Sequence, residues 1–340
     1  MMQTLYRIAR AALFQLDPET AHDVAMKAMC ALGPAAALLG AGADRDESRT
    51  VMGIAFPNPV GLAAGFDKNA EYLDTLHALG FGHLEAGTVT PRPQPGNPKP
   101  RLFRLVEHDA IINRMGFNNV GVERFLRNVE KSAFRGVLGI NIGKNFDTPI
   151  ERAADDYLLC LDAVYDRATY VAVNISSPNT KNLRDLQSKE RLDELLAAIM
   201  QRRDALAARS GRVKPLAVKI APDLDDEQVE AIAELAVKHR LDGLIATNTT
   251  IGRKGVEGHP CATQAGGLSG RPVFEPSTAV LRKLSGHLRG RIPLIGVGGI
   301  HTGADAKAKI DAGASLVQVY TGFIFRGPDI IADARRALRR

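Results

Sequence analysis

Eight short apolar runs recur along the chain, and each ends in a polar or glycine-rich tip ahead of an amphipathic stretch. The runs cover residues 59–65, 83–90, 137–143, 170–176, 215–221, 243–249, 293–300 and 316–322. They alternate little between polar and apolar positions, which is the pattern of parallel strands buried on both faces. Helical periodicity follows at 69–79, 225–239 and 302–312, and Asp225 and Thr302 are candidate N-caps.

Strands and helices that alternate in this way predict an α/β fold, a (β/α)8 TIM barrel. An open, doubly wound sheet is the alternative, but no GxGxxG motif follows the first strand. A chain of 340 residues is long enough for one such barrel, which typically needs about 250 residues, and for additions to it. We therefore expect a catalytic barrel over residues 41–340 and a small helical extension over residues 1–40.

Residues 91–119 interrupt the repeat between the second strand and the next helix. This segment is rich in Pro, Gly and Asn, and it is too long for an ordinary connection between a strand and a helix. We interpret it as an active-site insertion.

The N-terminal extension has the pattern of two amphipathic helices. The first carries an apolar stripe formed by Leu5, Ile8, Ala9, Ala12 and Leu13. Arg7 and Arg10 lie off this stripe. Asp17 and Pro18 then suit the N-cap and first residue of a second helix that ends near residue 32. Its apolar side carries Val24, Ala25, Ala28, Met29 and Leu32. Such stripes serve equally well to pack on a barrel or to face a membrane, and the pattern leaves both open.

Composition places the chain among soluble globular proteins, with 45% hydrophobic and 24% charged residues. No stretch reaches the ~20 apolar residues of a membrane-spanning helix. The first residues also lack the uninterrupted apolar core of a signal peptide, because Arg7 and Arg10 interrupt it. We expect a cytoplasmic protein, either soluble or attached to a membrane face.

The net charge of +6 is compatible with an acidic partner. Nucleic acid is not expected, because the basic residues are dispersed and Trp is absent. Anionic lipid or a phosphorylated ligand suits the charge equally well. Cys30, Cys160 and Cys261 form neither a disulfide framework nor a CxxC pair. The eight histidines show no metal-ligand spacing, so no metal site is expected.

The tips of the predicted strands carry the candidate chemistry, because barrel enzymes work at the carboxyl ends of their strands. The seventh and eighth tips combine a glycine-rich turn at 296–299 with Tyr320-Thr321-Gly322, where such barrels commonly hold a phosphate. Tight turns alone would also explain the glycines. Asparagines crowd the same end, and their carboxamides suit a flat ring such as a pyrimidine or an isoalloxazine. They are Asn113, Asn118, Asn141, Asn174, Asn179 and Asn248.

Six motifs resemble those of the dihydroorotate dehydrogenases, specifically their quinone-dependent, membrane-associated class 2. They are LDPE at 16–19, GLAAGFDKN at 61–69, NRMGFNN at 113–119, VNISSPNT at 173–180, GGLSG at 266–270 and GVGGI at 296–300. The resemblance covers essentially the whole chain.

The resemblance implies an enzyme of pyrimidine biosynthesis that oxidises (S)-dihydroorotate to orotate, with FMN as hydride acceptor and a membrane quinone as final acceptor. The implied catalytic base is Ser177. The implied FMN site consists of Ala64, Gly65, Thr88, Asn141, Asn174, Lys219, Thr247, Gly270, Gly299, Tyr320 and Thr321. The implied substrate contacts come from Lys68, Asn113, Arg114, Met115, Gly116, Phe117, Asn174, Asn179, Asn248 and Thr249.

The resemblance also implies how the parts would act. Serine is a weak base, so we hypothesise a proton exit past Thr180 and Phe117. Lys219 near the flavin N1 edge would stabilise an anionic reduced cofactor. We expect a monomer at the cytoplasmic face of the inner membrane, attached peripherally to the lipid surface, in which the two helices form a quinone tunnel. Deleting residues up to about 39 should then abolish quinone reduction and spare flavin reduction.

Three alternatives remain open. A cytosolic enzyme of the same reaction, using fumarate or NAD, would carry Cys in place of Ser177 and lack the extension. A flavin-free aldolase or isomerase would explain the phosphate tips but not the asparagines. A non-catalytic membrane-binding module would leave Lys68, Ser177 and Lys219 without a purpose. A yellow colour would favour the oxidoreductase alternatives, because only these predict a bound flavin.

Overall fold

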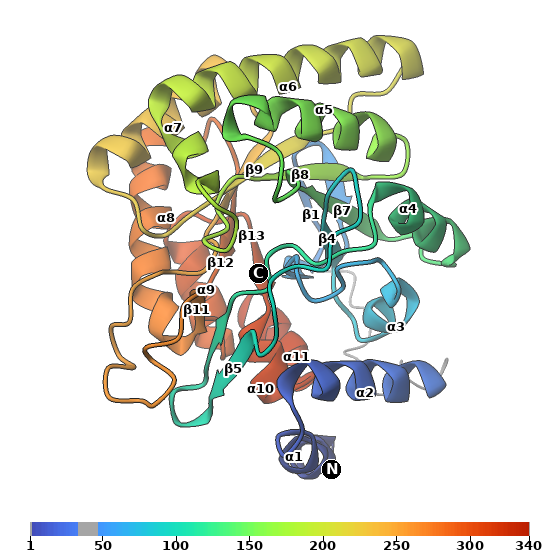
Figure 1. Ribbon diagram of the computed structural model, residues 1–340, viewed down its shortest axis with the longest axis vertical. Helices are drawn as coiled ribbons and strands as arrows, with labels where there is room; N and C mark the ends of the chain where they lie inside the picture. Colours follow the sequence, from blue (N-terminus) through green and yellow to red (C-terminus); the bar gives the residue numbers. More distant parts are fainter. Residues whose placement is uncertain (1, 33–46, 340) are drawn as a thin grey trace.

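A closed barrel of eight parallel strands forms the body of the molecule (Figure 1). The computed structural model describes residues 2–32 and 47–339. Each predicted apolar run contains one barrel strand, and these are β3 (Val60–Leu62), β4 (His83–Val89), β7 (Val137–Ile142), β8 (Tyr170–Asn174), β9 (Leu216–Ile220), β10 (Gly243–Ala246), β12 (Leu294–Val297) and β13 (Leu316–Val319). They follow one another around the barrel in chain order. The predicted TIM barrel is confirmed.

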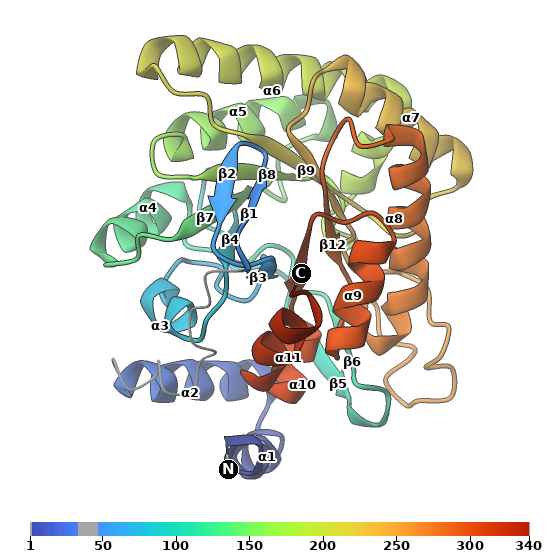
Figure 2. The ribbon, with the colours of Figure 1, turned by 180° about the vertical axis from the view of Figure 1, so that it is seen from behind.

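Helices alternate with the strands and cover the outside of the barrel (Figures 1 and 2). They are α3 (Leu73–Ala78), α4 (Val122–Lys131), α5 (Ala153–Val164), α6 (Lys189–Ser210), α7 (Asp226–Lys238), α8 (Phe274–Leu288), α9 (Gly303–Asp311), α10 (Thr321–Arg326) and α11 (Asp329–Ala337). Short 3-10 helices also occur, namely η3 (Val106–His108), η4 (Ile150–Arg152), η5 (Leu183–Gln187) and η6 (Arg271–Val273). The strands are buried on both faces, which explains why their sequences do not alternate.

The helix starts predicted at Asp225 and Thr302 are confirmed. Asp225 accepts a hydrogen bond from the Gln228 amide at 2.8 Å, and the Gln228 side chain accepts one from the Asp225 amide at 3.1 Å. Thr302 and Asp305 form the same reciprocal capping box at the start of α9. These caps satisfy amides that the first helical turn leaves without partners.

The helix predicted at 69–79 begins later, at Leu73. Asp67 accepts hydrogen bonds from the amides of Glu71 and Tyr72, each at 2.9 Å, and so holds the preceding residues in a turn. Ala70 adopts a left-handed conformation with φ of 56°, which a right-handed helix does not accommodate.

The active-site insertion contains two strands that the sequence pattern did not predict. β5 (Leu102–Leu105) pairs antiparallel with β6 (Ala110–Asn113), and β11 (Gly267–Gly270) pairs with the other side of β6. At the opposite end of the barrel, β1 (Arg49–Val51) and β2 (Ile54–Phe56) form a second hairpin. Its Phe56 packs with Ile245 and Ile295 in the barrel interior and closes that end.

The two N-terminal helices, α1 (Met2–Leu13) and α2 (Pro18–Ala31), lie beside α10 and β5 (Figures 1 and 2). We name α1, α2 and their connection the N-terminal hairpin. Asp17 caps α2 as predicted, accepting from the amides of Glu19 and Thr20 at 3.1 Å. The Tyr6 hydroxyl donates to the Ile324 carbonyl at 2.6 Å, so the hairpin packs on the barrel.

Both helices of the hairpin carry apolar residues on two sides. Met26 is fully buried, whereas Ile8, Val24 and Leu32, all placed on the predicted apolar stripes, are 65%, 45% and 48% exposed. Arg10, predicted to lie off the stripe, donates to the Phe325 carbonyl at 2.7 Å. The predicted boundary between residues 40 and 41 lies outside the described residues. None of the described helices is long and apolar enough to cross a bilayer.

Candidate active site

A cavity opens at the carboxyl ends of the barrel strands, and we name it the strand-end cavity. The loops after most of these strands line it, together with the insertion and β11. The predicted site residues that line it are Ala64, Gly65, Lys68, Thr88, Asn113, Met115, Gly116, Phe117, Asn174, Ser177, Asn179, Lys219, Thr247, Asn248, Thr249, Gly270, Gly299, Tyr320 and Thr321. All predicted site residues but two therefore meet at one cavity, and their binding roles stay predictions.

Arg114 and Asn141 are the two exceptions. The Arg114 guanidinium binds the Gln264 side chain at 2.8 Å and the Pro100 carbonyl at 2.9 Å, and it stacks over the Phe103 ring. Arg114 therefore braces the insertion instead of lining the cavity. Asn141 is fully buried behind the cavity wall and accepts the Thr88 hydroxyl at 2.5 Å.

Glu85 is a central residue of this wall that was not predicted from the sequence. Its fully buried carboxylate accepts hydrogen bonds from Asn141 Nδ2 at 2.9 Å and from Tyr170 OH at 3.0 Å. Gln318 Nε2 donates to it at 2.8 Å, and Lys219 Nζ lies 3.7 Å away. A buried carboxylate needs such partners, because removing its charge from water is costly. An acidic residue inside an apolar strand was the available signal.

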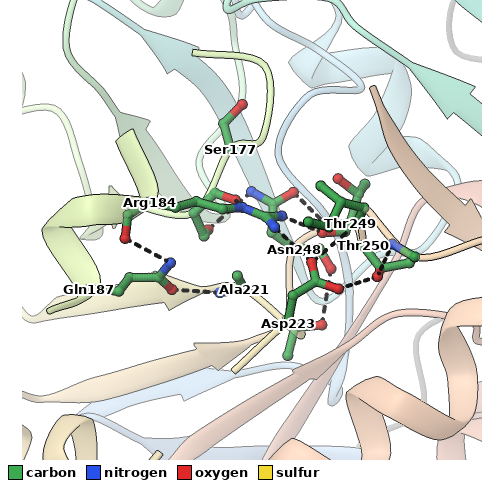
Figure 3. Close-up of polar contacts among 12 residues, drawn as sticks. Ser177, Arg184, Gln187, Ala221, Asp223, Asn248, Thr249 and Thr250 are labelled. Atoms are coloured by element: carbon green, nitrogen blue, oxygen red, sulfur yellow. Dashed lines mark hydrogen bonds and ion pairs between the residues drawn. The ribbon is translucent and has the colours of Figure 1, made fainter. Parts of the chain in front are cut away.

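The loop that carries Ser177 is fixed by Arg184 (Figure 3). The Arg184 guanidinium donates to the Ser176 carbonyl at 3.0 Å and to the Thr249 carbonyl at 2.8 Å. Its third hydrogen bond reaches the Asp223 carboxylate at 2.7 Å. Because Ser176 precedes Ser177, one guanidinium sets the position of the predicted base and of a predicted substrate residue.

Asp223 and Gln187 extend this network to the loop after β9 (Figure 3). Asp223 accepts hydrogen bonds from the Thr250 hydroxyl and from the Ile251 amide, the latter at 3.1 Å. The Gln187 side chain accepts the Ala221 amide at 2.9 Å. Three loops that are far apart in the sequence are thereby held at one side of the cavity.

Glycines bring the main chain close to the cavity at its other end. Gly298 and Gly299 have φ of 111° and 75°, values that side-chain-bearing residues rarely adopt. A Cβ on Gly299 would lie 2.4 Å from the Phe274 Cα. Glycine is therefore required here for close packing as well as for conformation. The arrangement suits the predicted phosphate position, where backbone N–H groups serve as donors.

Lys68 lines both the strand-end cavity and a second, neighbouring cavity. Burial, with the charge of Arg101, lowers the pKa of Lys68 to about 8, although Glu19 acts in the opposite direction. A cation that is costly to bury gains most from an anionic ligand, which replaces the hydration it has lost. The Lys68 ammonium therefore suits a carboxylate in the strand-end cavity.

The second cavity lies between the N-terminal hairpin and the barrel, and we name it the hairpin groove. Its volume is about 350 Å³, and most of its wall comes from apolar side chains of α1, α2 and the segment after β13. The groove and the strand-end cavity share the residues Gly65, Lys68, Met115 and Tyr320. His22 and Arg104 are polar exceptions in its wall. Burial and the Lys68 charge lower the pKa of His22 to about 4, so His22 is neutral at physiological pH.

Comparison with known proteins agrees with this geometry. The family model of dihydroorotate dehydrogenase matches residues 48–340. Among similar proteins, a dihydroorotate dehydrogenase (quinone) from Paraburkholderia phymatum is 59% identical over 340 residues, covering 99% of this chain and 98% of that protein. One from Burkholderia pseudomallei is 59% identical over 349 residues, and both chains are covered completely.

Solved structures show the same likeness. The crystal structure of DHODH from Eimeria tenella in complex with ferulenol matches with a TM-score of 0.87 and 41% identity, covering 95% of this chain and 90% of that one. The ligand-free form of the same protein matches with a TM-score of 0.86, covering 95% of this chain and 94% of that one. Fold and site thus define a barrel oxidoreductase. The chain belongs to the dihydroorotate dehydrogenase family, which confirms the resemblance seen in its motifs.

Proposed function

We propose that this protein oxidises dihydroorotate to orotate and passes the electrons to a membrane quinone, as a step of pyrimidine biosynthesis. The junction of the two cavities carries the proposal, because a cavity lined by many amides, hydroxyls and lysines meets a more apolar groove at the shared wall of Gly65, Lys68, Met115 and Tyr320. The name of the relatives, dihydroorotate dehydrogenase (quinone), describes one polar and one apolar partner of this kind.

The residues of the strand-end cavity fit FMN, which when bound would accept a hydride and release electrons. Gln318 lines the cavity, and its Oε1 is buried without a hydrogen-bond partner among the described residues. This acceptor suits an N–H group of a flat ring. Lys219 places a positive charge in the same wall, where it would stabilise a negative ring. The Gly299 turn and Thr321 would hold the phosphate.

Dihydroorotate would lie between the FMN site and the insertion. Its carboxylate suits Lys68, and its ring C=O and N–H groups suit the carboxamides. Asn179 Nδ2 donates to Asn113 at 3.1 Å, and Asn248 Nδ2 donates to Ser176 Oγ at 3.0 Å. These contacts fix the orientation of the amides before a ligand arrives, which lowers the entropy cost of binding.

Ser177 would remove the proton from the ring carbon beside the carbonyl. Its Oγ accepts the Asn179 amide at 3.2 Å, which fixes the hydroxyl at the cavity wall. The proton needs an onward acceptor, because serine is a weak base. Thr180 Oγ1 is buried and has no partner among the described residues, so it is available to relay a proton. Phe117, which lines the cavity, would shield this path from bulk water.

The hairpin groove would admit the quinone from the lipid. Its apolar wall suits an isoprenoid tail, and neutral His22 and the Arg104 guanidinium offer donors for a quinone oxygen. Ile8, Val24 and Leu32 are exposed, and apolar side chains of this kind suit insertion among lipid headgroups. We therefore infer that residues 1–40 form a membrane-associating unit on a catalytic domain of residues 41–340. The protein would act as a peripheral monomer at the cytoplasmic face.

An anaerobic experiment tests both half-reactions. The purified protein is mixed with dihydroorotate while the flavin absorbance is followed, and a soluble quinone, NAD and fumarate are then offered in turn. The expected result is bleaching by dihydroorotate followed by recovery with quinone alone.

Each other outcome has a defined meaning. If dihydroorotate does not bleach the flavin, the assigned fold and cofactor stand, but dihydroorotate is not the substrate. If NAD or fumarate restores the flavin absorbance, the electron acceptor is a soluble one, and the proposed role of the hairpin groove is refuted. A colourless protein that cannot be reconstituted with FMN would refute the oxidoreductase function altogether.

A further inference from the structure

An ion pair between buried Arg101 and partly buried Glu19 joins the N-terminal hairpin to the active-site insertion. Glu19, in the first turn of α2, receives two hydrogen bonds from Arg101, from Nε at 2.9 Å and from Nη2 at 3.0 Å. Lys99 Nζ lies 3.4 Å from the same carboxylate. Arg101 is 7% exposed, so its charge is largely removed from water. Such a pair is favourable when its geometry is bidentate and its other donors are satisfied.

Arg101 uses its remaining donor group to hold a loop of the insertion. Its Nη1 donates to the Pro95 carbonyl at 2.6 Å and to the Asn97 carbonyl at 2.9 Å. The Arg101 carbonyl accepts the Arg114 amide at 2.8 Å. One residue therefore connects α2, the loop at 94–97 and the start of the predicted substrate segment.

The loop at 94–97 in turn supports the substrate segment at 113–117. Three hydrogen bonds join them, from the Asn97 amide to Met115 O (3.1 Å), from Asn97 Nδ2 to Arg114 O (2.9 Å) and from Gln94 Nε2 to Gly116 O (3.0 Å). The contact is close, since a Cβ on Gly96 would lie 2.2 Å from the Met115 carbonyl oxygen. A shift of the loop would therefore displace the segment that lines the strand-end cavity.

We propose that Arg101, held by Glu19, is a positioning residue for dihydroorotate, so that the N-terminal hairpin belongs to the substrate site as well as to the quinone site. This inference rests on the proposed function. If Glu19 lost its charge, the buried guanidinium of Arg101 would have no counterion. It would then move toward solvent, because an unpaired buried charge is costly. The loop at 94–97 would then move with the guanidinium, and the substrate segment would lose its support.

The electrostatics of Glu19 favour the same arrangement. Burial alone would raise the pKa of Glu19, but the hydrogen bonds and charges of Arg101 and Lys99 outweigh it and hold the pKa below its ordinary value. Glu19 is therefore charged at physiological pH. Its charge also supports the protonated form of Lys68 at the shared wall.

Arg104 provides a natural contrast to Arg101. It lies at the other end of the same short strand region and also binds the hairpin, donating to the carbonyls of Phe14 at 3.0 Å and of Leu16. No described hydrogen bond joins Arg104 to the loop at 94–97. Arg104 thus holds the hairpin without supporting the substrate segment.

The test compares full-length, FMN-loaded variants Glu19→Gln, Arg101→Lys and Arg104→Gln with the wild type. Lys27→Gln removes a charge from an exposed position of α2 and is the matched control. Orotate affinity is measured without turnover from the flavin absorbance, and amide hydrogen exchange is followed over residues 94–117. Anaerobic flavin reduction then separates the KM for dihydroorotate from the limiting rate.

We expect Glu19→Gln to weaken orotate binding by roughly ten-fold, which corresponds to about 1.4 kcal/mol. Amide exchange over 94–117 should accelerate, and the KM should rise while the limiting rate of flavin reduction stays near wild type. Arg101→Lys should act in the same direction, because an ammonium cannot replace the planar fork that reaches Glu19 and two carbonyls together. Arg104→Gln should raise the KM for quinone and leave orotate affinity unchanged.

Two results would overturn the inference. Wild-type orotate affinity in Glu19→Gln, with a raised KM for quinone, would mean that the hairpin serves the quinone alone. Equal losses of orotate affinity in Glu19→Gln and Arg104→Gln would mean general loosening of the hairpin. If dihydroorotate fails to reduce the wild type, the proposed function fails, whereas unchanged amide exchange in Glu19→Gln refutes the link between the hairpin and the insertion by itself.

Discussion

The strand-end cavity and the hairpin groove share a wall but are built from different side chains. Amides, hydroxyls and lysines supply the polar groups of the cavity, and hydrogen bonds such as that from Asn174 Nδ2 to Thr88 Oγ1 at 3.0 Å fix their directions. Apolar residues such as Ala25 and Met29 form most of the groove. Hydrogen bonds are directional, whereas apolar contact depends mainly on shape. Changes in the cavity should therefore be severe and confined to one half-reaction, and changes in the groove should be graded.

The largest effect is expected for Ser177→Ala. Removing the proposed base should slow flavin reduction by dihydroorotate on the order of 10²–10⁴-fold, the usual contribution of a positioned proton acceptor. Stopped-flow absorbance measures this rate, and reoxidation of chemically reduced flavin by quinone should stay unchanged. Ser210→Ala, at an exposed position, is the control. A reduction rate within the range of that control would remove Ser177 from the chemistry.

Arg184→Lys should have the next largest effect. A lysine can still pair with Asp223, but it cannot also reach the Ser176 and Thr249 carbonyls. Flavin reduction should slow by about 10- to 100-fold, because small misplacements of reacting groups are costly. Arg191→Lys, at a partly exposed position of α6, should be neutral, because a lysine keeps the charge beside Glu151. If flavin reduction and flavin reoxidation slowed equally, the cause would be a general structural defect and not a displacement of Ser177.

Ala25→Phe tests the groove. The added ring would occupy space beside Met29 and raise the KM for quinone on the order of ten-fold, in line with overpacking costs of about 1–3 kcal/mol. Flavin reduction by dihydroorotate should not change, and steady-state assays at varied quinone concentration provide the measurement. Ala31→Phe, near the exposed end of α2, is the control. A slower flavin reduction would contradict the division between cavity and groove.

A smaller effect is expected for Thr180→Ala. Losing the hydroxyl should slow flavin reduction several-fold, because the proton from Ser177 would leave less readily. Thr180→Ser retains the hydroxyl and should restore the rate, while orotate affinity should be the same in all three proteins. An unchanged rate in Thr180→Ala would exclude this residue from the proton path.

The smallest effect concerns pH at the shared wall. Because the pKa of Lys68 is lowered to about 8, the ammonium loses its proton as the pH rises through that value. The proposed ion pair between Lys68 and the carboxylate of dihydroorotate is then lost, so kcat/KM for dihydroorotate should fall above about pH 8. Lys68→Met should have a lower kcat/KM without this decline. The same decline in Lys68→Met would assign it to another group.

Most of the strand-end cavity could be predicted from the sequence because the fold places polar strand tips together. A barrel sends the carboxyl ends of all its strands to one end, so Lys68, Ser177 and Lys219 meet although they are far apart in the chain. Glu85 escaped prediction because its role appears only when Asn141, Tyr170 and Lys219 surround it in space. Nothing in the sequence around Glu85 alone identifies these partners.

The hairpin was predicted less well, for a physical reason. Alanine-rich helices offer more than one apolar side. Val24 and Leu32 were placed on the same apolar side as Ala25 and Met29, but Val24 and Leu32 are exposed whereas Ala25 and Met29 line the hairpin groove. The strands β5 and β6 were missed because proline and glycine surround them. Glu19 and Arg101 are 82 positions apart in the sequence, and no local sequence pattern predicts such a contact.

The shared wall of Gly65, Lys68, Met115 and Tyr320 has a kinetic consequence. The two cavities approach it from different sides, so the oxidised product and the incoming electron acceptor need not use the same space. With the two ligands placed as proposed, orotate would remain bound while a quinone enters. The steady state would follow a two-site ping-pong scheme, in which orotate competes with dihydroorotate but not with quinone. The barrel would thereby isolate a water-soluble metabolite from a lipid-soluble one while a single prosthetic group serves both.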